Sequence, residues 1–333
     1  MASRIPAVGS RVLEYGLTLL AALTVNFALP YVAPGNPLRY QLGQAVEGLS
    51  EEQRAELLET YGLDQPIHVQ YVDYLLGIAQ GDLGTSVMYG QPVSDVLLQR
   101  LPWTLLLVGA ALVLSTVVGT LLGGLSAWRE GDRTDAALMT SHVTAESAPA
   151  FWVGMLLISV FVSWLGWFPS YGTSSVDAAG SLVGSILSIA IHLALPLLTL
   201  TVARVGGIYL IARGSVLTTL GEDFLLFSRA KGLSDRDVLF RHAIPNSLLP
   251  IYTRFTLQLG SVVGGAVVVE TVFSYPGLGL LIYDAAIARD YPLLQGAFLV
   301  LTVTVIAANI VADLTYPFLD PRTTARTGRR AAE

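Results

Sequence analysis

Residues 228–247 read SRAKGLSDRDVLFRHAIPNS, a charged stretch that separates two long apolar runs of the chain. It contains the only lysine of the chain, three arginines and one histidine, with two aspartates between them. A charged stretch of this kind is most often a solvated loop. Its own helix signals therefore decide whether it has a fixed structure.

The residues that lead into this stretch carry the end signals of a short helix. Glu222 and Asp223 are acidic and favour a helix N-terminus, whereas Lys231 favours a C-terminus. Gly232 follows, and glycine readily adopts the left-handed conformation that ends many helices. We therefore expect a short helix that ends at Gly232.

Ser234 predicts a second helix directly after this turn. Its hydroxyl suits an N-cap, and Asp235 and Asp237 place negative charge in the first turn. The helix is expected to run through the apolar residues 238–240 and to end before Pro245, because proline disfavours helical geometry in the preceding residue. Residues 238–240 need burial, either on the same protein or on another chain.

These features favour a docking element over a plain solvated loop. A solvated loop needs neither two sets of helix caps nor three consecutive apolar residues. We call residues 221–247 the charged loop, and we interpret it as a folded segment that docks onto its own protein or a partner.

The composition of the whole chain is that of a membrane protein. Of 333 residues, 53% are hydrophobic and 13% are charged, where soluble domains carry roughly 25% charged residues. The absence of cysteine excludes disulfides and thiolate metal sites. A net charge of −6 without a basic tract gives no support for nucleic-acid binding. The arginine-rich, lysine-poor usage fits a salt-adapted or high-GC prokaryotic source.

We count six candidate membrane spans, since a bilayer core needs about 20 apolar residues per helix. The uncharged stretches are 15–38, 101–128, 148–176, 178–203, 255–269 and 291–312. The third is expected to span with residues 149–168. The fifth is short and must recruit residues 248–253, which places Arg254 near one end, where it can extend to the interface.

The basic residues predict the orientation. Fourteen of them fall on the side that holds the charged loop and both termini, and four fall on the other side. Because positive residues accumulate in cytoplasmic loops, both termini and the charged loop are expected to be cytoplasmic. Arg4 and Arg11 also resemble the start of a signal peptide, but no clean cleavage site follows, so we prefer a retained anchor helix.

The segment 32–100 is expected to form a small extracytoplasmic helical cap. Ser50 as N-cap, Gln53 three residues later and Gly62 as a stop predict one helix. Residues 68–79 predict a second, amphipathic helix. The apolar positions assigned to one face of it are Val69, Val72, Leu75 and Leu76.

The chain lacks the motifs of common enzymes. It has no GxxxxGK[ST] phosphate loop, no HExxH and no GxSxG, so it is not itself the usual nucleotide hydrolase. His142 and Glu146 stand four apart but lack a third metal ligand, which favours a structural role. His192 lies in an apolar span, where we expect a packed or hydrogen-bonded histidine rather than a proton relay. Glu270 and Asp313 fall at predicted span ends, which weakens the case for an ion-coupled secondary transporter.

Seven stretches, in order, resemble the permease subunit of the dipeptide, oligopeptide and nickel group of ATP-binding-cassette (ABC) importers. They are VAPGNPLRYQLG, YGLDQPIHVQYVDYL, GDLGTSVMYGQPVSDVLLQRLPWTLLL, SAPAFWVGMLLI, HLALPLLTL, RAKGLSDRDVLFRHAIPNSLLPI and VVVETVFSYPGLGLLIYDAAIARDYPLLQG. The resemblance implies an all-α, polytopic fold of six transmembrane helices with a type I (MetI-like) importer core at 98–318. Residues 1–31 would form the N-terminus and first span, 32–100 the cap and 319–333 a cytoplasmic tail.

In such permeases the loop before the penultimate span docks onto a separate ATPase. Gly232 and Pro245 match the glycine and proline of the family pattern, and Ile244 fits its leucine, whereas His242 replaces an isoleucine. The usual Glu-Ala-Ala is replaced by residues 226–228, Leu-Phe-Ser, which puts in doubt any role of that glutamate. The residues to which the resemblance gives an ATPase-coupling role are Arg229, Ala230, Lys231, Gly232, Leu233, Ser234, Asp235, Asp237, Val238, Leu239, Arg241, His242 and Pro245.

The resemblance also implies the assembly and leaves the solute open. The expected partners are a second homologous permease, two ABC ATPases, an extracytoplasmic solute-binding protein and membrane lipid. ATP would be used by the ATPases, with no cofactor, metal or catalytic residue in this chain, a multi-pass protein of the cell membrane. Peptides are the expected solute, with nickel, glutathione or oligosaccharide as alternatives. A secondary transporter or channel, and an intramembrane enzyme, are the competing classes.

Overall fold

The computed structural model describes residues 5–32, 50, 52–53, 64–169, 171–172 and 181–319. Within these ranges the chain is helical, and the nearest approach to a strand is one isolated bridge between Thr85 and Pro92. The expected all-α class is therefore confirmed. The chain divides into two compact units, one formed by residues 1–103 and 277–307 and the other by residues 104–276 and 308–333.

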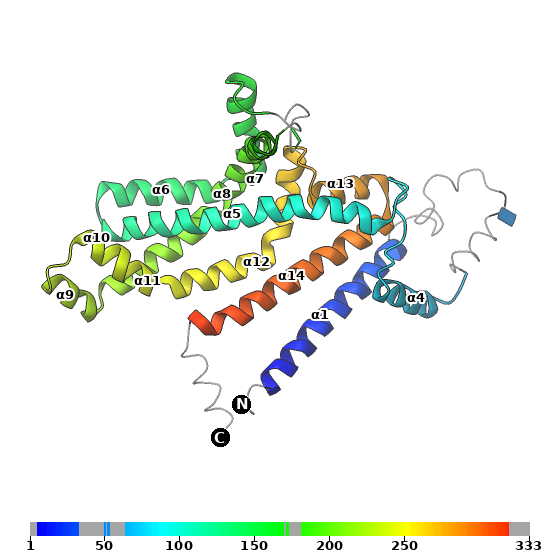
Figure 1. Cartoon of the computed structure of the whole chain (residues 1–333), viewed down its shortest axis with the longest axis horizontal. Helices are drawn as coiled ribbons and strands as arrows, with labels where there is room; N and C mark the ends of the chain where they lie inside the picture. Colours follow the sequence, from blue (N-terminus) through cyan, green and yellow to red (C-terminus); the bar gives the residue numbers. More distant parts are fainter. Residues whose placement is uncertain are drawn as a thin grey trace. The chain divides into compact units, whose positions relative to one another are not determined.

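Among the residues that the structure describes, four helices are long and apolar enough to cross a membrane, and Figure 1 labels all four. The membrane-length stretches are Arg11–Val32 of α1 (Ile5–Val32), α5 (Val93–Trp128), α8 (Leu182–Leu220) and Tyr291–Thr315 of α14 (Tyr291–Leu319). α12 (Leu248–Val272) covers the fifth predicted span. The count of six spans stays a prediction.

The third predicted span is bent at its start. α6 (Arg133–Ser147) meets the helix formed by α7 (Ala150–Leu157) and η2 (Ile158–Trp164) at 103°. The bend falls at Pro149, whose predecessor Ala148 is extended, as expected for a residue before proline. The half formed by α7 and η2 is strongly apolar, whereas α6 is much more polar and its one buried residue is Asp135.

The first unit is built around the start of α5. Val93, Val96 and Leu97 pack against α13 (Leu278–Ala288) and the first turns of α14. Gly296 permits this contact, because a side chain there would place its Cβ 2.4 Å from Val93 Cγ1. The helices of this unit thus approach each other through a small residue, as is common in membrane proteins.

The helix α4 (Ile67–Ala79) confirms the second helix predicted in the cap. Its contact face differs from the prediction: Tyr71 and Tyr74 bond to Thr24 and Asn26 of α1, while Val72 and Leu76 are each 52% exposed. Aromatic packing on Phe27 decides this orientation, with ring centroids 5.1 and 5.4 Å from Tyr71 and Tyr74. Burial raises the pKa of the Tyr74 hydroxyl, which keeps it neutral.

The first predicted cap helix is described only at its start. Ser50 N–H donates to Gln53 Oε1 and Gln53 N–H donates to Ser50 Oγ, at 3.0 and 3.2 Å. This is the reciprocal capping pair predicted from the sequence. Gly62, the predicted stop, lies outside the described residues.

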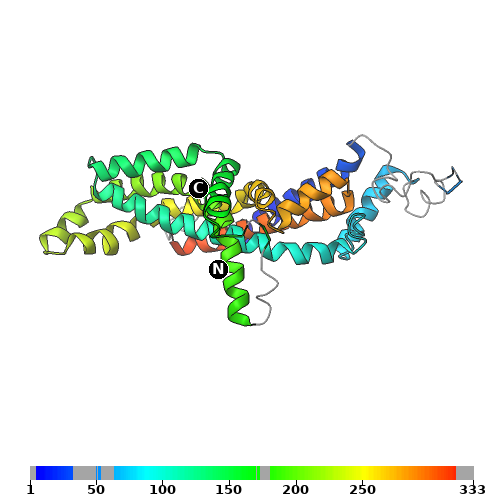
Figure 2. The same ribbon diagram turned by 90° about the horizontal axis from the view of Figure 1, so that it is seen from above.

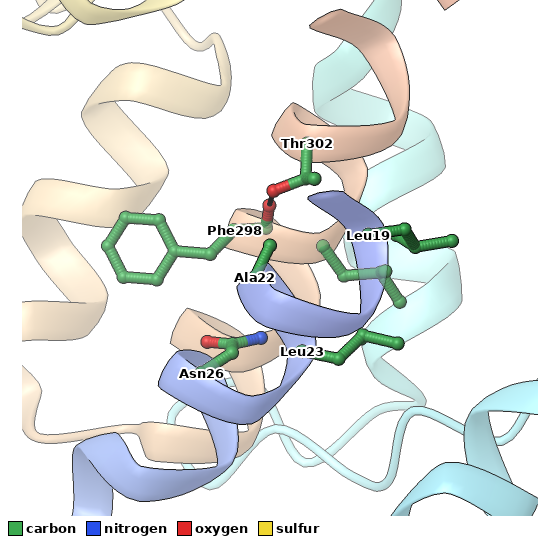
Figure 3. Close-up of a pocket in the computed structure, with 7 residues that line it drawn as sticks. Leu19, Ala22, Leu23, Asn26, Phe298 and Thr302 are labelled. Atoms are coloured by element: carbon green, nitrogen blue, oxygen red, sulfur yellow. Dashed lines mark hydrogen bonds between the residues drawn. The ribbon is translucent and has the colours of Figure 1, made fainter. Parts of the chain in front are cut away.

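Asn26 links α1 to α14 inside the first unit. Its Nδ2 donates to the Gln295 carbonyl at 2.7 Å, and Gln295 Nε2 returns a bond to the Asn26 carbonyl at 3.1 Å. Figure 3 shows Asn26 beside a small pocket to which α1 contributes Ala22 and Leu23 and α14 contributes Phe298 and Thr302. These paired amide bonds hold two apolar helices in one register.

A buried aspartate closes the end of the first unit. Asp290 is 1% exposed, and its Oδ2 accepts hydrogen bonds from Ser86 Oγ at 2.6 Å and from Met88 N–H at 2.9 Å. Its Oδ1 accepts from Leu293 N–H at 3.1 Å, which caps α14. One carboxylate therefore joins the turn before α5 to the start of α14.

We expect Asp290→Ala to lower the free energy of unfolding by about 3 kcal/mol, because two buried donors and one part-buried donor lose a charged acceptor. The apparent melting temperature in detergent measures the effect. Asp290→Asn keeps the shape and one acceptor oxygen, so it should lose less. Equal melting temperatures for Asp290→Ala and the wild type would show that these bonds contribute nothing.

The second unit is organised on α8. Gly119 and Gly123 of α5 lie directly on it, since a Cβ at Gly123 would meet the Tyr209 carbonyl oxygen at 2.6 Å. α6 also runs along α8, and both views show these two helices side by side (Figures 1 and 2). Glu270, near the end of α12, is fully buried and accepts from Thr104 Oγ1 at 2.7 Å. Glu270 thus lies near the end of the helix that covers the fifth predicted span.

Candidate functional site

The charged loop belongs to the second unit and follows α8 directly. It consists of α9 (Asp223–Ala230) and a second helical segment made of α10 (Asp235–Asp237), η4 (Val238–Ala243) and α11 (Ile244–Asn246). Figure 1 shows the labelled helices α9, α10 and α11 in succession at the end of α8. The two predicted helices and the turn between them are therefore confirmed.

The turn between the two helices depends on Gly232. Its φ is +80°, a left-handed conformation that strains any residue with a Cβ. Gly232 N–H donates to the Arg229 carbonyl at 2.9 Å, and Lys231 N–H donates to the Phe227 carbonyl at 3.1 Å. These bonds satisfy the last turn of α9, as the glycine cap requires.

Ser234 caps the second helical segment as predicted. Its Oγ accepts from Asp237 N–H at 3.2 Å and donates to Asp237 Oδ2 at 2.6 Å. Asp237 Oδ1 also pairs with Arg241 Nε at 3.2 Å, one turn further on. Asp237 thus helps to fix the start of this helical segment.

The prediction that Pro245 ends the second helix was wrong. Residue 244 keeps helical angles, φ −58° and ψ −49°, and the helix continues to Asn246. The reason is the wider π-helical turn at Val238–Ala243, whose i→i+5 bonding shifts the register before the proline. Proline lacks the backbone N–H that an α-helix uses at each position, and its ring needs space that an α-helix does not leave. The wider turn relieves both conflicts.

The charged loop is anchored by a small apolar core. Leu225 of α9 and Val238 and Leu239 of η4 are buried, at 1%, 0% and 4% exposed, against Ala127 of α5 and Val216 of α8. Val238 and Leu239 were predicted as ATPase-coupling residues, but they are covered by their own chain. They fix the loop to the ends of α5 and α8.

The outer face of the loop is apolar and basic. Phe240 was expected to need burial, yet it is 50% exposed, and Phe227 is 70% exposed. The exposed apolar residues are Phe224, Leu226, Phe227, Leu233 and Phe240. The other predicted coupling residues are exposed, apart from half-buried Asp237 and His242: Arg229, Ala230, Lys231, Gly232, Leu233, Ser234, Asp235, Arg241 and Pro245. We call the five apolar residues above, together with the exposed basic residues Arg229, Lys231 and Arg241, the outer face.

Sequence reasoning missed the exposed aromatic residues of α9. Two of the basic residues rest on aromatic rings, with Arg229 5.2 Å from the Trp128 ring centroid and Lys231 5.7 Å from that of Phe227. The phenylalanines of this predicted cytoplasmic loop could have indicated them, because an aromatic side chain exposed on a helix is favoured only where another surface buries it. The basic groups are thereby held beside the apolar patch.

A buried ion pair lies just behind the loop, and it was not predicted. Arg213 of α8 donates twice to Asp135 of α6, Nε to Oδ1 at 2.8 Å and Nη2 to Oδ2 at 2.7 Å. Ser126 of α5 donates to the same carboxylate and bonds Tyr209 of α8 at 2.6 Å, and Gly131 N–H adds a bond at 3.1 Å. One carboxylate therefore connects α6 to α5 and α8, the two helices that anchor the loop.

Two histidines of this unit, His142 and His192, have structural partners. His142 stacks on Tyr209 with ring centroids 4.4 Å apart, and its Nδ1 lies 2.8 Å from the Leu138 carbonyl. His192 Nδ1 lies 2.8 Å from the Ser188 carbonyl, which confirms the expected hydrogen-bonded histidine. In the part of the chain that the structure describes, no three potential ligands gather in a way that suits a metal ion.

Comparison with known families matches both parts of the chain. Residues 119–325 match the family described as binding-protein-dependent transport system inner membrane component, and residues 8–108 match the N-terminal family of the same components. The first match includes the charged loop, α6, α8 and α12. The chain belongs to this family of inner membrane transport components.

Several curated relatives are similar over nearly their whole length. The oligopeptide transport system permease protein AppB of Bacillus subtilis is 36% identical over 91% of this chain and 94% of its own. The di/tripeptide permease DppB of Pseudomonas aeruginosa and the dipeptide permease DppB of Escherichia coli are each 36% identical over 92% of this chain and 94% of theirs.

A solved structure shares the fold. An inward-facing structure of the MetNI methionine ABC transporter covers 68% of this chain and 96% of its own, with a TM-score of 0.55 and 16% identity. At this identity the likeness concerns the fold alone, and it supports the expected type I core. The chain is accordingly a helical membrane component of a transport system.

Proposed function

We propose that this chain is the permease subunit of an ATP-driven importer whose solutes are short peptides. The observation that carries the solute class is the end-to-end similarity to permeases that are named for oligopeptides, dipeptides and tripeptides. The chain would form half of the pathway beside a second homologous permease. A solute-binding protein would deliver the peptide on the extracytoplasmic side.

The charged loop is the proposed contact with the ATPase subunits. Its core residues Val238 and Leu239 fix it to α5 and α8, so a shift imposed on the loop reaches those helices as a rigid movement. The outer face supplies aromatic anchors and basic groups, the residue types enriched at interface hot spots. The ATPase groove is expected to be apolar with acidic residues at its edge.

We propose the same division of the chain as the sequence predicts. Residues 98–318 form the transporter core, 32–100 the extracytoplasmic cap facing the binding protein, and both termini are cytoplasmic. ATP is bound and hydrolysed by the two ATPases, and this chain binds no cofactor. The fourteen-to-four distribution of basic residues supports this orientation.

Reconstitution tests the function directly. The permease pair, its ATPases and the binding protein are placed in liposomes, and uptake of radiolabelled dialanine is measured with and without ATP. We expect uptake only when ATP and the binding protein are both present. Uptake by the chain without ATPases, driven by an ion gradient, would instead establish a secondary transporter.

A further inference from the structure

Two opposite charges of the second unit lie beside one glycine of α8. A Cβ atom at Gly207 would lie 3.1 Å from Glu146 Oε1 of α6 and 3.1 Å from Arg254 Nη2 of α12, so these two atoms are at most about 6.2 Å apart. Arg254 Nε lies 3.8 Å from the same point. The edge of the guanidinium that can donate two parallel bonds to a carboxylate therefore lies beside Gly207.

The two groups do not form an ion pair in this structure. Both residues are fully described, and their charged atoms are more than 4.0 Å apart, since neither residue takes part in an ion pair. Arg254 Nε is buried and has no hydrogen-bond partner in the described chain. A buried charged donor without an acceptor is unfavourable, so a state that brings the Glu146 carboxylate to this edge gains a favourable contact.

The end of α6 can change the position of Glu146. Asp135 joins α6 to Arg213 of α8 at 2.8 and 2.7 Å near the start of the helix, whereas Glu146 lies eleven residues further on. The chain then bends by 103° at Pro149. Residues at the end of a helix are common hinge positions, so a change in this bend moves Glu146 while the start of α6 keeps its contact.

Arg254, by contrast, moves with α8 and the charged loop. Ser215 Oγ of α8 donates to the Ser247 carbonyl at 3.0 Å, and the hydroxyl oxygens of Thr219 and Ser247 are 2.8 Å apart. These bonds fix the start of α12, and Arg254 follows about two helical turns later. A shift imposed on the charged loop therefore carries Arg254 relative to the end of α6.

We propose that Glu146 and Arg254 form a state-dependent ion pair, a latch that is open in this structure and closes beside Gly207 in another state of the transport cycle. The inference rests on the proposed function, which supplies the alternation between states. Closing gives Arg254 Nε an acceptor and joins α6 to α12. Glycine at position 207 permits the closure, because a side chain there would crowd both groups.

Charge exchange tests the latch in the complete importer in liposomes, with uptake of radiolabelled dialanine driven by ATP and the binding protein. We expect Glu146→Arg and Arg254→Glu each to lower the uptake rate about tenfold, because each places two like charges beside Gly207. The double variant Glu146→Arg/Arg254→Glu restores opposite charges and should recover most of the wild-type rate. A double variant that melts at the wild-type temperature yet transports no better than the single variants would overturn the latch.

Gly207→Ala probes the room that the closed pair needs. The nearest atoms to a Cβ there are the ends of two flexible side chains, so the fold tolerates the change, whereas the uptake rate should fall at least about fivefold. Gly214→Ala is the matched control, since it lies on the same helix and a Cβ there meets nothing within 4 Å. Uptake unchanged in both variants would show that the pair does not close beside Gly207.

Crosslinking measures the change of state directly. The chain has no cysteine, so Glu146→Cys/Arg254→Cys supplies a unique thiol pair when the partner subunits are cysteine-free as well. The yield with a short bifunctional thiol reagent should differ at least about fivefold between the nucleotide-free and the vanadate-trapped importer. Equal yields, with ATP-driven uptake by the wild type, would reject the latch and leave the proposed function standing. Absence of that uptake in the wild type would reject both.

Discussion

Replacing both Phe227 and Phe240 with aspartate is expected to abolish uptake by the reconstituted importer while the chain still inserts into the membrane. The two rings are 70% and 50% exposed on the outer face, so their removal leaves the anchoring core of the loop intact. An interface that buries them would have to desolvate two unpaired carboxylates, which is strongly unfavourable. Co-purification of the ATPases with the tagged permease should fall at least about a hundredfold, the effect of roughly 2.7 kcal/mol in binding free energy.

Val72→Asp provides a matched control for this variant. Val72 is an apolar residue, 52% exposed on α4, far in sequence from the charged loop. Its change to aspartate should leave ATPase co-purification at the wild-type level. If the Phe227/Phe240 variant retained both its ATPases and its transport, the outer face would not be the docking surface.

The helix caps show what a single sequence predicts well. Ser234 bonds within three residues and Gly232 depends on its own backbone angle, so both signals are local and both were confirmed. The Ser50–Gln53 pair was predicted for the same reason. Apolar length is equally local, which is why the helical membrane class follows from the sequence.

Pro245 shows where local rules mislead. Proline rules assume an α-helix, whereas the turn at Val238–Ala243 is π-helical and changes the register before the proline. The wide turn accompanies the burial of Val238 and Leu239 against α5 and α8. The backbone of this turn thus goes together with a tertiary contact, which the loop sequence alone does not reveal.

The charged contacts of the second unit were beyond a reading of one sequence. Asp135 and Arg213 are 78 positions apart, and Glu146 of α6 and Arg254 of α12 both lie beside Gly207 of α8. Gly207 carries a signal only once its two neighbours in space are known. Charges in apolar chains mark residues worth examining, but pairing them requires the helix packing.

We expect Arg213→Ala to be the most destabilising single change in the second unit, lowering the free energy of unfolding by about 3–5 kcal/mol. Arg213 supplies two bonds to Asp135, whose side chain is 8% exposed. Without the guanidinium, a buried carboxylate keeps only the Ser126 hydroxyl and the Gly131 N–H as donors. The apparent melting temperature of the purified chain should fall, and protease cleavage near residues 129–133 should increase as the start of α6 loosens.

The double variant Asp135→Leu/Arg213→Met separates charge from packing. Removing both partners leaves no uncompensated buried charge, so the double variant should be more stable than Arg213→Ala although it lacks the same ion pair. Apolar side chains of similar length also preserve the contact between α6 and α8. The wild type, Asp135→Leu, Arg213→Met and the double variant form a cycle, and their melting temperatures are compared with that of Arg213→Ala under one condition. A double variant as unstable as Arg213→Ala would mean that the directional bonds, rather than the isolated carboxylate, hold α5, α6 and α8 together.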